Sequence, residues 1–232
     1  MQDQKRNLLS TIPVITEEKE WIAVNKPAGI SVHNNEDRDN LLSTLEKQLN
    51  HKSLFPVHRL DKETSGVQIL ALTEKAARDL ATEFQNKNTD KFYTGVLRGQ
   101  LKLESGLWQQ ALTDKAEGRK NPAGLGHQRI PCATEFKVLR KNKYFSYCEF
   151  KILTGRQHQI RKHSALSNHA IVGDSRYGDT KYNQKISNLY KNERMFLHSQ
   201  KIRILNIEIS CADEFSFLLN EPATVCEKSI KL

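Results

Sequence analysis

The length of the chain, 232 residues, is enough to bury a sizeable core, and we expect a single domain over residues 1–232. Hydrophobic residues make up 38% and charged residues 27%, which excludes global disorder. Lysine and arginine number 36 against 27 aspartates and glutamates, and the formal charge of +9 favours a polyanionic partner such as nucleic acid. A solvated basic surface that keeps the chain in solution explains the same charge equally well.

Membrane proteins and disulfide-stabilised proteins are not indicated. No apolar run approaches the roughly 20 residues that a spanning helix needs, and no signal-type hydrophobic segment follows the first residues. We therefore expect a cytoplasmic protein without a membrane partner. The cysteines, at Cys132, Cys148, Cys211 and Cys226, form no CxxC pair and predict reduced thiols, with neither a zinc site nor a disulfide framework.

Two units of a strand followed by a helix are predicted in the first part of the chain. The strands are 21–24 and 67–72, short apolar runs bounded by turn residues. Each helix follows a residue that can cap it, Asp39 or Asn40 for the first and Thr73 for the second. The apolar positions at helical spacing are Leu41, Leu42, Leu45 and Leu49 in the first helix and Ala76, Ala77, Leu80 and Phe84 in the second.

Further strands are predicted from residue 91 onward. Residues 91–99 alternate in character, which places Tyr93 on one face of the strand, and 133–139 and 144–153 predict a hairpin with a basic tip. The segment 113–131 between them is rich in Gly, Asn, Pro and Lys and has no apolar period. Loops of this length are usually functional, and a basic one can order on an acidic partner, although a mobile surface excursion remains the alternative.

The last part of the chain predicts one more helix and two closing strands. A Thr-Gly step breaks the preceding strand, and Arg156, Ile160 and His163 then recur at helical spacing on one face of the expected helix. The closing strands are 195–198 and 201–204. Strands outnumber helices without strict alternation, which predicts an α+β fold with a mixed, mostly antiparallel central sheet and flanking helices.

The stretch HRLDKETSG, from His58 to Gly66, stands out because it places one carboxylate, Asp61, between cationic residues just before an apolar strand. A solvated surface acid would not require the compact Thr-Ser-Gly step that follows. The glycine permits backbone angles that other residues avoid, and the hydroxyl groups can bond to backbone groups. The pattern therefore indicates a carboxylate that is held in place.

Three residues far apart in the sequence supply complementary chemistry, namely Asp61, Tyr93 and Arg156. An arginine near a carboxylate favours its ionised form and can hold it through a bidentate pair, which would keep Asp61 available as a nucleophile at neutral pH. Buried Asp–Arg pairs are mostly structural, so the spacing alone leaves a catalytic and a structural role open.

Other kinds of site find less support. His158 and His163 are five residues apart and no HExxH motif is present, so the pattern of metal ligands fails. Asp61 and Glu63 could suggest paired glycosidase carboxylates, but two acids in one turn do not oppose each other across a sugar. The sequence has no GxxxxGK[ST] or GxGxxG motif for a nucleotide. We expect neither a metal nor a cofactor.

Six short motifs follow one another over roughly residues 20 to 205. They are NKPxG at 25–29, HRLDxxTSG at 58–66, a tyrosine strand at 91–93, GRxHQIR at 155–161, GDxxYG at 173–178 and LH at 197–198. In this combination and order the chain resembles the RluA family of pseudouridine synthases. Agreement of several separate motifs by chance is improbable.

The resemblance implies the pseudouridine synthase catalytic fold and isomerisation of uridine to pseudouridine in a structured tRNA or rRNA stem-loop, with no cofactor or metal. Asp61 would be the catalytic aspartate, Tyr93 would stack on the target base, and Arg156 would pair with the aspartate. Arg59 and Leu197 match positions that line the site. Stacking on Tyr93 and insertion of Arg59 could offset the few kcal/mol that unstacking a uracil costs. Candidate phosphate contacts are Arg98, Arg119, Lys120, Arg161 and Lys162, each of which could instead be an ordinary solvated charge.

Several points stay open in the sequence. Asp61 would attack the ribose C1′ or its neighbouring position. Larger family members carry an S4 RNA-binding domain, and the residues before Trp21 are too few for one, so we expect RNA recognition by the catalytic domain and a monomer. An RNA-binding protein without catalysis is the main alternative, and an RNA or DNA glycosidase that uses the same aspartate is the second.

Overall fold

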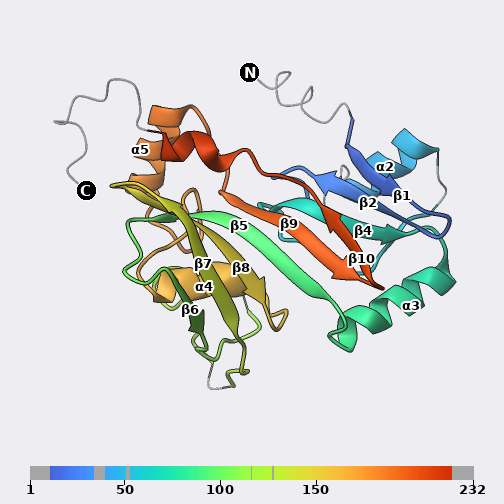
Figure 1. Cartoon of the computed structure of the whole chain (residues 1–232), viewed down its shortest axis with the longest axis horizontal. Coiled ribbons are helices and arrows are strands. Elements are labelled where there is room, and N and C mark those ends of the chain that lie inside the picture. Colours follow the sequence, from blue (N-terminus) through green and yellow to red (C-terminus); the bar gives the residue numbers. More distant parts are fainter. Residues whose placement is uncertain (1–10, 34–39, 51–52, 116, 127, 221–232) are drawn as a thin grey trace.

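The computed structural model describes residues 11–33, 40–50, 53–115, 117–126 and 128–220. Its strands are β1 (Val14–Glu17), β2 (Trp21–Lys26), β3 (Phe55–Pro56), β4 (Ser65–Ala71), β5 (Asp90–Arg98), β6 (Ser105–Trp108), β7 (Thr134–Lys141), β8 (Phe145–Ile152), β9 (Leu197–Ile204) and β10 (Ile207–Ser210). Its helices are α2 (Leu41–Leu49), α3 (Glu74–Gln85), α4 (Gln159–Leu166), α5 (Thr180–Tyr190) and the 3-10 helix η2 (Phe215–Leu219). These strands form one sheet in the order β1-β2-β4-β9-β5-β8-β7-β6, with β3 paired to β4 and β10 to β9 (Figure 1).

Among the described strands, neighbours run antiparallel except β4 and β9. This parallel pair joins Ser65 to His198 and Gly66 to Ser199. The two backbones approach so closely that a Cβ atom on Gly66 would lie 2.2 Å from the carbonyl oxygen of Ser199, and the φ of Gly66 is +110°. Only glycine fits there. The predicted α+β class with a mixed, mostly antiparallel sheet is confirmed.

Helices cover both faces of both halves of the sheet. In the β2–β4 half, Leu45 of α2 packs on one face and Leu80 of α3 on the other, because alternate residues of these strands point to opposite sides. In the half around β5 and β8, Ile160 of α4 packs on the face that carries Tyr93. The opposite face is covered by α5 and η2, whose Tyr182 belongs to the same cluster as Val96. The centre of the sheet thus lies between two separately packed halves.

The predicted starts of the first two helices are confirmed. Asn40 caps α2, since its Oδ1 accepts the Ser43 N–H at 3.0 Å, and Thr73 caps α3 through its Oγ1, which accepts the Ala76 N–H at 3.1 Å. The alternation in 91–99 is also confirmed, because Tyr93 and Val96 belong to clusters on opposite faces.

The prediction of two closing strands is wrong. Residues 201–204 and the end of 195–198 form one strand, β9, which lies in the centre of the sheet between β4 and β5. The predicted turn at Ser65 and Gly66 already belongs to β4. Helix α4 begins at Gln159, so Arg156 stands before the helix and not on its face. Strands β1, β3, β6 and β10 were not predicted, because runs of four residues or fewer carry little periodicity.

Two further sequence expectations concern the whole chain. No helix in the described segments is long and apolar enough to cross a bilayer. Cys132, Cys148 and Cys211 are free thiols, and Cys226 lies outside the described residues.

Candidate active site

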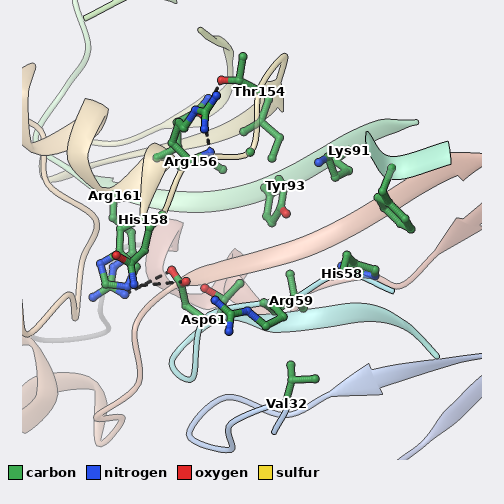
Figure 2. A pocket seen from close by; sticks show the side chains of 18 of the residues that line it. Val32, His58, Arg59, Asp61, Lys91, Tyr93, Thr154, Arg156, His158 and Arg161 are labelled. Carbon is green, nitrogen blue, oxygen red and sulfur yellow. Dashed lines mark hydrogen bonds and ion pairs between the residues drawn. The ribbon is translucent and has the colours of Figure 1, made fainter. Parts of the chain in front are cut away.

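A cleft of about 1050 Å³ is lined by the loop before β4, the start of β5, the segment between β8 and α4, and the start of β9. Asp61, Tyr93 and Arg156 all line this cleft, as do Arg59 and Leu197 (Figure 2). The structure therefore brings the three predicted catalytic residues together with the two predicted lining residues, although they come from four separate parts of the chain.

Hydrogen bonds to β4 hold the loop that carries Asp61. The Gln68 amide nitrogen donates to the His58 carbonyl oxygen at 2.8 Å, and its amide oxygen accepts the Leu60 N–H at 3.3 Å. The His58 ring nitrogen Nε2 accepts the Ile69 N–H at 3.0 Å, and burial lowers the pKa of His58 to about 3, which keeps the ring neutral. A glutamine in an otherwise apolar strand thus fixes the loop.

A buried lysine ties a second turn to the same loop. The Lys26 Nζ donates to the carbonyl oxygens of Pro27 at 3.0 Å, Ile30 at 2.8 Å and Lys62 at 3.2 Å. Burial lowers the pKa of Lys26 to about 7, although the nearby Asp61 carboxylate raises it. The NKPxG turn therefore docks onto the residue that follows the aspartate.

Arg161 is the cation that meets Asp61. Its Nη1 lies 3.4 Å from Asp61 Oδ2 and 3.2 Å from Glu63 Oε2. Its Nε and Nη2 donate to the two oxygens of Asp174 at 2.7 and 2.9 Å, a bidentate pair. The Arg161 side chain is 2% exposed and Asp174 is fully buried. Burial lowers the pKa of Arg161, but the hydrogen bonds and the charge of Asp174 raise it further, so the guanidinium stays charged beside Asp61.

The predicted pair between Arg156 and Asp61 is wrong. Arg156 Nη1 lies 3.7 Å from Asp114 Oδ2, and Figure 2 shows Arg156 across the cleft from Asp61. The reason is the turn before α4, in which the Arg156 N–H donates to the Gln159 side chain at 3.1 Å and His158 takes a left-handed φ of 55°. This turn places Arg156 on the far wall and the first turn of the helix beside Asp61.

His158 also approaches the aspartate. Its Nε2 lies 3.7 Å from Asp61 Oδ1, and its Nδ1 lies 3.0 Å from the Tyr177 hydroxyl. Burial lowers the pKa of His158 below its usual value, although the Asp61 charge opposes this. The neutral ring accepts from the tyrosine at Nδ1 in the tautomer that directs its N–H toward Asp61. His158 and Arg161 thus flank the two oxygens of one carboxylate.

Tyr93 stands on the β5 wall of the cleft. It is 9% exposed and packs with Leu60, Leu97 and Leu197. Burial, together with the Asp61 charge, raises the pKa of Tyr93, so the phenol is neutral. The ring offers an apolar face inside a cleft whose other side carries the carboxylate.

Two of the predicted phosphate contacts are wrong. Arg161 and Lys162 are 2% and 0% exposed, so neither can reach a phosphate from this position. Arg161 is bound to carboxylates, and the Lys162 Nζ donates to the Thr113 carbonyl oxygen at 2.7 Å. An arginine next to a lysine predicts a basic surface, but on α4 both side chains are buried.

The other predicted contacts lie differently. Arg59 is exposed and lines the cleft, and Leu197 is buried in its wall. Arg98, Arg119 and Lys120 lie outside the cleft lining. The Arg98 guanidinium carbon is 4.3 Å from the centre of the Tyr182 ring, and Arg119 pairs with Asp179 at 2.7 Å.

The sequence did not link three residues to the position of Asp61. Lys26, His158 and Asp174 all fall inside the motifs named above, but the pairing with Asp61 was predicted for the first arginine of GRxHQIR. Knowing where the helix begins would have assigned Arg161 correctly. In the described part of the chain, no group of three or more His, Cys, Asp or Glu side chains is placed to hold a metal ion.

Similarity to known proteins decides the family. Residues 20–166 match the family model described as RNA pseudouridylate synthase. The chain belongs to this family. It is a pseudouridine synthase and thus an isomerase, and the resemblance to the RluA family is confirmed.

Relatives of this chain include proteins named for two kinds of RNA. The tRNA pseudouridine synthase C of Vibrio parahaemolyticus is 31% identical over 84% of this chain and 85% of its own length. The ribosomal large subunit pseudouridine synthase C of the same species is 32% identical over 82% of this chain and 60% of its own length. The solved structure of human RNA Pseudouridylate Synthase Domain Containing 1 aligns with a TM-score of 0.77 at 23% identity, over 91% of this chain and 87% of that one. This likeness confirms the predicted pseudouridine synthase fold.

Proposed function

We propose that this protein isomerises specific uridines to pseudouridine in a structured tRNA or rRNA stem-loop, with Asp61 as the nucleophile. The observation that carries the proposal is the environment of Asp61. Its carboxylate lies 3.4 Å from the guanidinium of buried Arg161, across a cleft from the neutral ring of Tyr93. An adjacent fixed cation favours the ionised carboxylate, which is the form that attacks carbon.

The reaction conserves all atoms of the nucleotide. Asp61 forms a bond to C1′ as the bond between C1′ and N1 of uracil breaks, or it takes the proton from the neighbouring C2′ as the same bond breaks, and either step releases the base within the cleft. The base turns and C5 bonds to C1′, while the bond between Asp61 and C1′ breaks, or C2′ regains its proton, so that the carboxylate is restored. The proton on C5 then leaves, and N1 takes up a proton. No external reactant is needed, and the cleft must only hold the free base in place.

The target uridine must leave its stack to reach Asp61. Unstacking costs a few kcal/mol, and stacking on an aromatic side chain contributes about 1–3 kcal/mol per base. Tyr93 supplies such a ring in the wall of the cleft, and Arg59 is exposed at the same cleft and available to fill the space that the base leaves. We assign base stacking to Tyr93 and stack insertion to Arg59.

Incubation with unmodified cellular RNA labelled in its uridines tests the proposal. We expect wild-type protein to form pseudouridine, detected by chromatography of the digested RNA. Binding without any pseudouridine would favour an RNA-binding protein, and free uracil with an abasic product would favour a glycosidase. Relatives are named for tRNA and for ribosomal RNA, so the target is identified by mapping the pseudouridines that disappear in a deletion strain.

Three expectations about the whole protein stay predictions. A single domain over residues 1–232 would unfold in one cooperative transition, a monomer would elute at the mass of one chain in size-exclusion chromatography, and a cytoplasmic protein would separate with the soluble fraction of cells.

A further inference from the structure

Lys91 lines the cleft and has no ion-pair partner among the residues that the structure describes. It belongs to β5, two residues before Tyr93, and its Nζ lies over Gly155, 3.6 Å from where a Cβ atom on that glycine would stand. The neighbouring carboxylate, Asp90, pairs with Lys151 at 2.8 Å. Burial lowers the pKa of the Lys91 ammonium group below its usual value.

The half-buried Lys91 has a loose contact, with its Nζ 5.8 Å from the centre of the Phe84 ring, whereas two fully buried lysines donate hydrogen bonds. The Lys26 Nζ donates to three carbonyl oxygens, and the Lys162 Nζ donates to that of Thr113. A desolvated ammonium group without such partners is unfavourable unless an anion compensates it. The position of Lys91 in the cleft wall therefore points to a negatively charged group of a ligand.

Two other residues that line the same cleft each carry a polar atom without a partner in the described chain. Within the described chain, the Nε of Arg156 and the Oγ1 of Thr89 are buried and have no hydrogen-bond partner. Arg156 directly follows Gly155, over which the Lys91 ammonium lies, and its pair with Asp114 is long, at 3.7 Å. Figure 2 shows Lys91 and Arg156 on the side of the cleft away from Asp61.

We propose that Lys91 and Arg156, with the hydroxyl of Thr89, form a subsite for one phosphodiester group next to the target uridine, an inference that rests on the proposed function. Phosphate matches this donor set, because arginine and lysine bind its oxygens through charge-assisted hydrogen bonds. Residues two apart on one strand face lie roughly 7 Å apart, a span that one nucleotide covers between its base on Tyr93 and its phosphate on Lys91.

Steady-state kinetics of Lys91→Met test the subsite on an unmodified transcript that the wild type converts. We expect KM to rise about three- to tenfold at moderate salt with kcat within about twofold, and the slope of log KM against log salt to fall by about one. Lys91→Arg should restore most of the affinity. The matched control is Lys137→Met, an exposed lysine of β7 outside the cleft, which should leave KM unchanged. A drop in kcat with an unchanged KM and salt slope would overturn the proposal.

A binding measurement separates failure of the subsite from failure of the proposed function. The probe is the RNA trinucleotide UpUpU, intact or with a neutral methylphosphonate at its first or its second linkage, titrated calorimetrically into the Asp61→Asn protein. We expect one of the two replacements to weaken binding about three- to tenfold, and Lys91→Met to abolish this difference. Equal binding of all three probes, or a difference that persists in Lys91→Met, would contradict the subsite whether or not the wild type forms pseudouridine.

Discussion

The charged side chains on the two sides of the cleft differ in whether they have partners within the protein. On the Asp61 side, the guanidinium of Arg161 meets three carboxylates, one of them the fully buried Asp174 in a bidentate pair. On the Lys91 side, the lysine has no ion-pair partner among the described residues, and Arg156 has only a long one. Partners already in place orient a reacting group before the substrate arrives, whereas unpartnered charges leave interaction energy for the substrate to use. If the proposals above hold, the attack on the sugar and the binding of one phosphate are carried by different walls.

The largest effect expected is on the Asp61 side. Asp61→Asn should lower kcat by at least about 10⁴-fold while RNA still binds, because an amide cannot act as the nucleophile. The measurement is single-turnover pseudouridine formation beside a binding titration. Glu63→Gln is the matched control, since Glu63 contacts the same atom of Arg161 at 3.2 Å, and it should retain at least about 100-fold more activity. Equal losses in both variants would deny Asp61 its special role.

The next largest effect separates the two arginines. Arg161→Met should lower the free energy of unfolding by about 3–5 kcal/mol, because Asp174 would be left buried without its cation. Arg156→Met should change it by less than about 1 kcal/mol, since the Arg156 side chain is 35% exposed and its ion pair is long. Urea unfolding of both variants gives the comparison. Similar losses in the free energy of unfolding would mean that Arg156 stabilises its wall of the cleft as much as Arg161 stabilises the other.

Tyr93 stands on the β5 wall, two residues after Lys91, and its substitution should report on stacking with the base. Tyr93→Ala should reduce kcat/KM about ten- to hundredfold, because stacking contributes about 1–3 kcal/mol per base. Tyr93→Phe keeps the ring and should keep KM near that of the wild type. If kcat of the phenylalanine variant fell as far as that of the alanine variant, the hydroxyl itself would take part in proton transfer.

A change in the pH dependence of stability is expected at Lys26. Its pKa is about 7 in the folded protein and has the ordinary, higher value of 10.5 in the unfolded chain. Between these values the unfolded chain binds more protons, so this lysine makes the free energy of unfolding rise with pH, by up to about 1.4 kcal/mol per pH unit. Unfolding of wild type and Lys26→Met between pH 7 and 10 should show a shallower slope in the variant. Parallel slopes would place the lysine in solvent.

Much of this could be predicted from local patterns. The capped helices after Asn40 and Thr73 and the alternating strand with Tyr93 are set by neighbours in the sequence, and the structure confirms them. The central place of β9 could not be predicted, because it depends on pairing with strands far away in the chain. The partner of Asp61 was missed for a related reason. The GRxHQIR motif holds two arginines, and the residue at which α4 begins decides which of them faces Asp61.

The close approach of Gly66 to Ser199 makes the width of the cleft depend on a residue that does not line it. In a parallel pair both strands begin at the same edge of the sheet, so the loop with Asp61 and the first residue of β9, Leu197, reach the cleft side by side. One methyl group on Gly66 would push the two strand ends apart. A misplacement of about 1 Å can cost on the order of 100-fold in rate. A substitution at this strand pairing inside the sheet could therefore abolish activity although every residue that lines the cleft is still present.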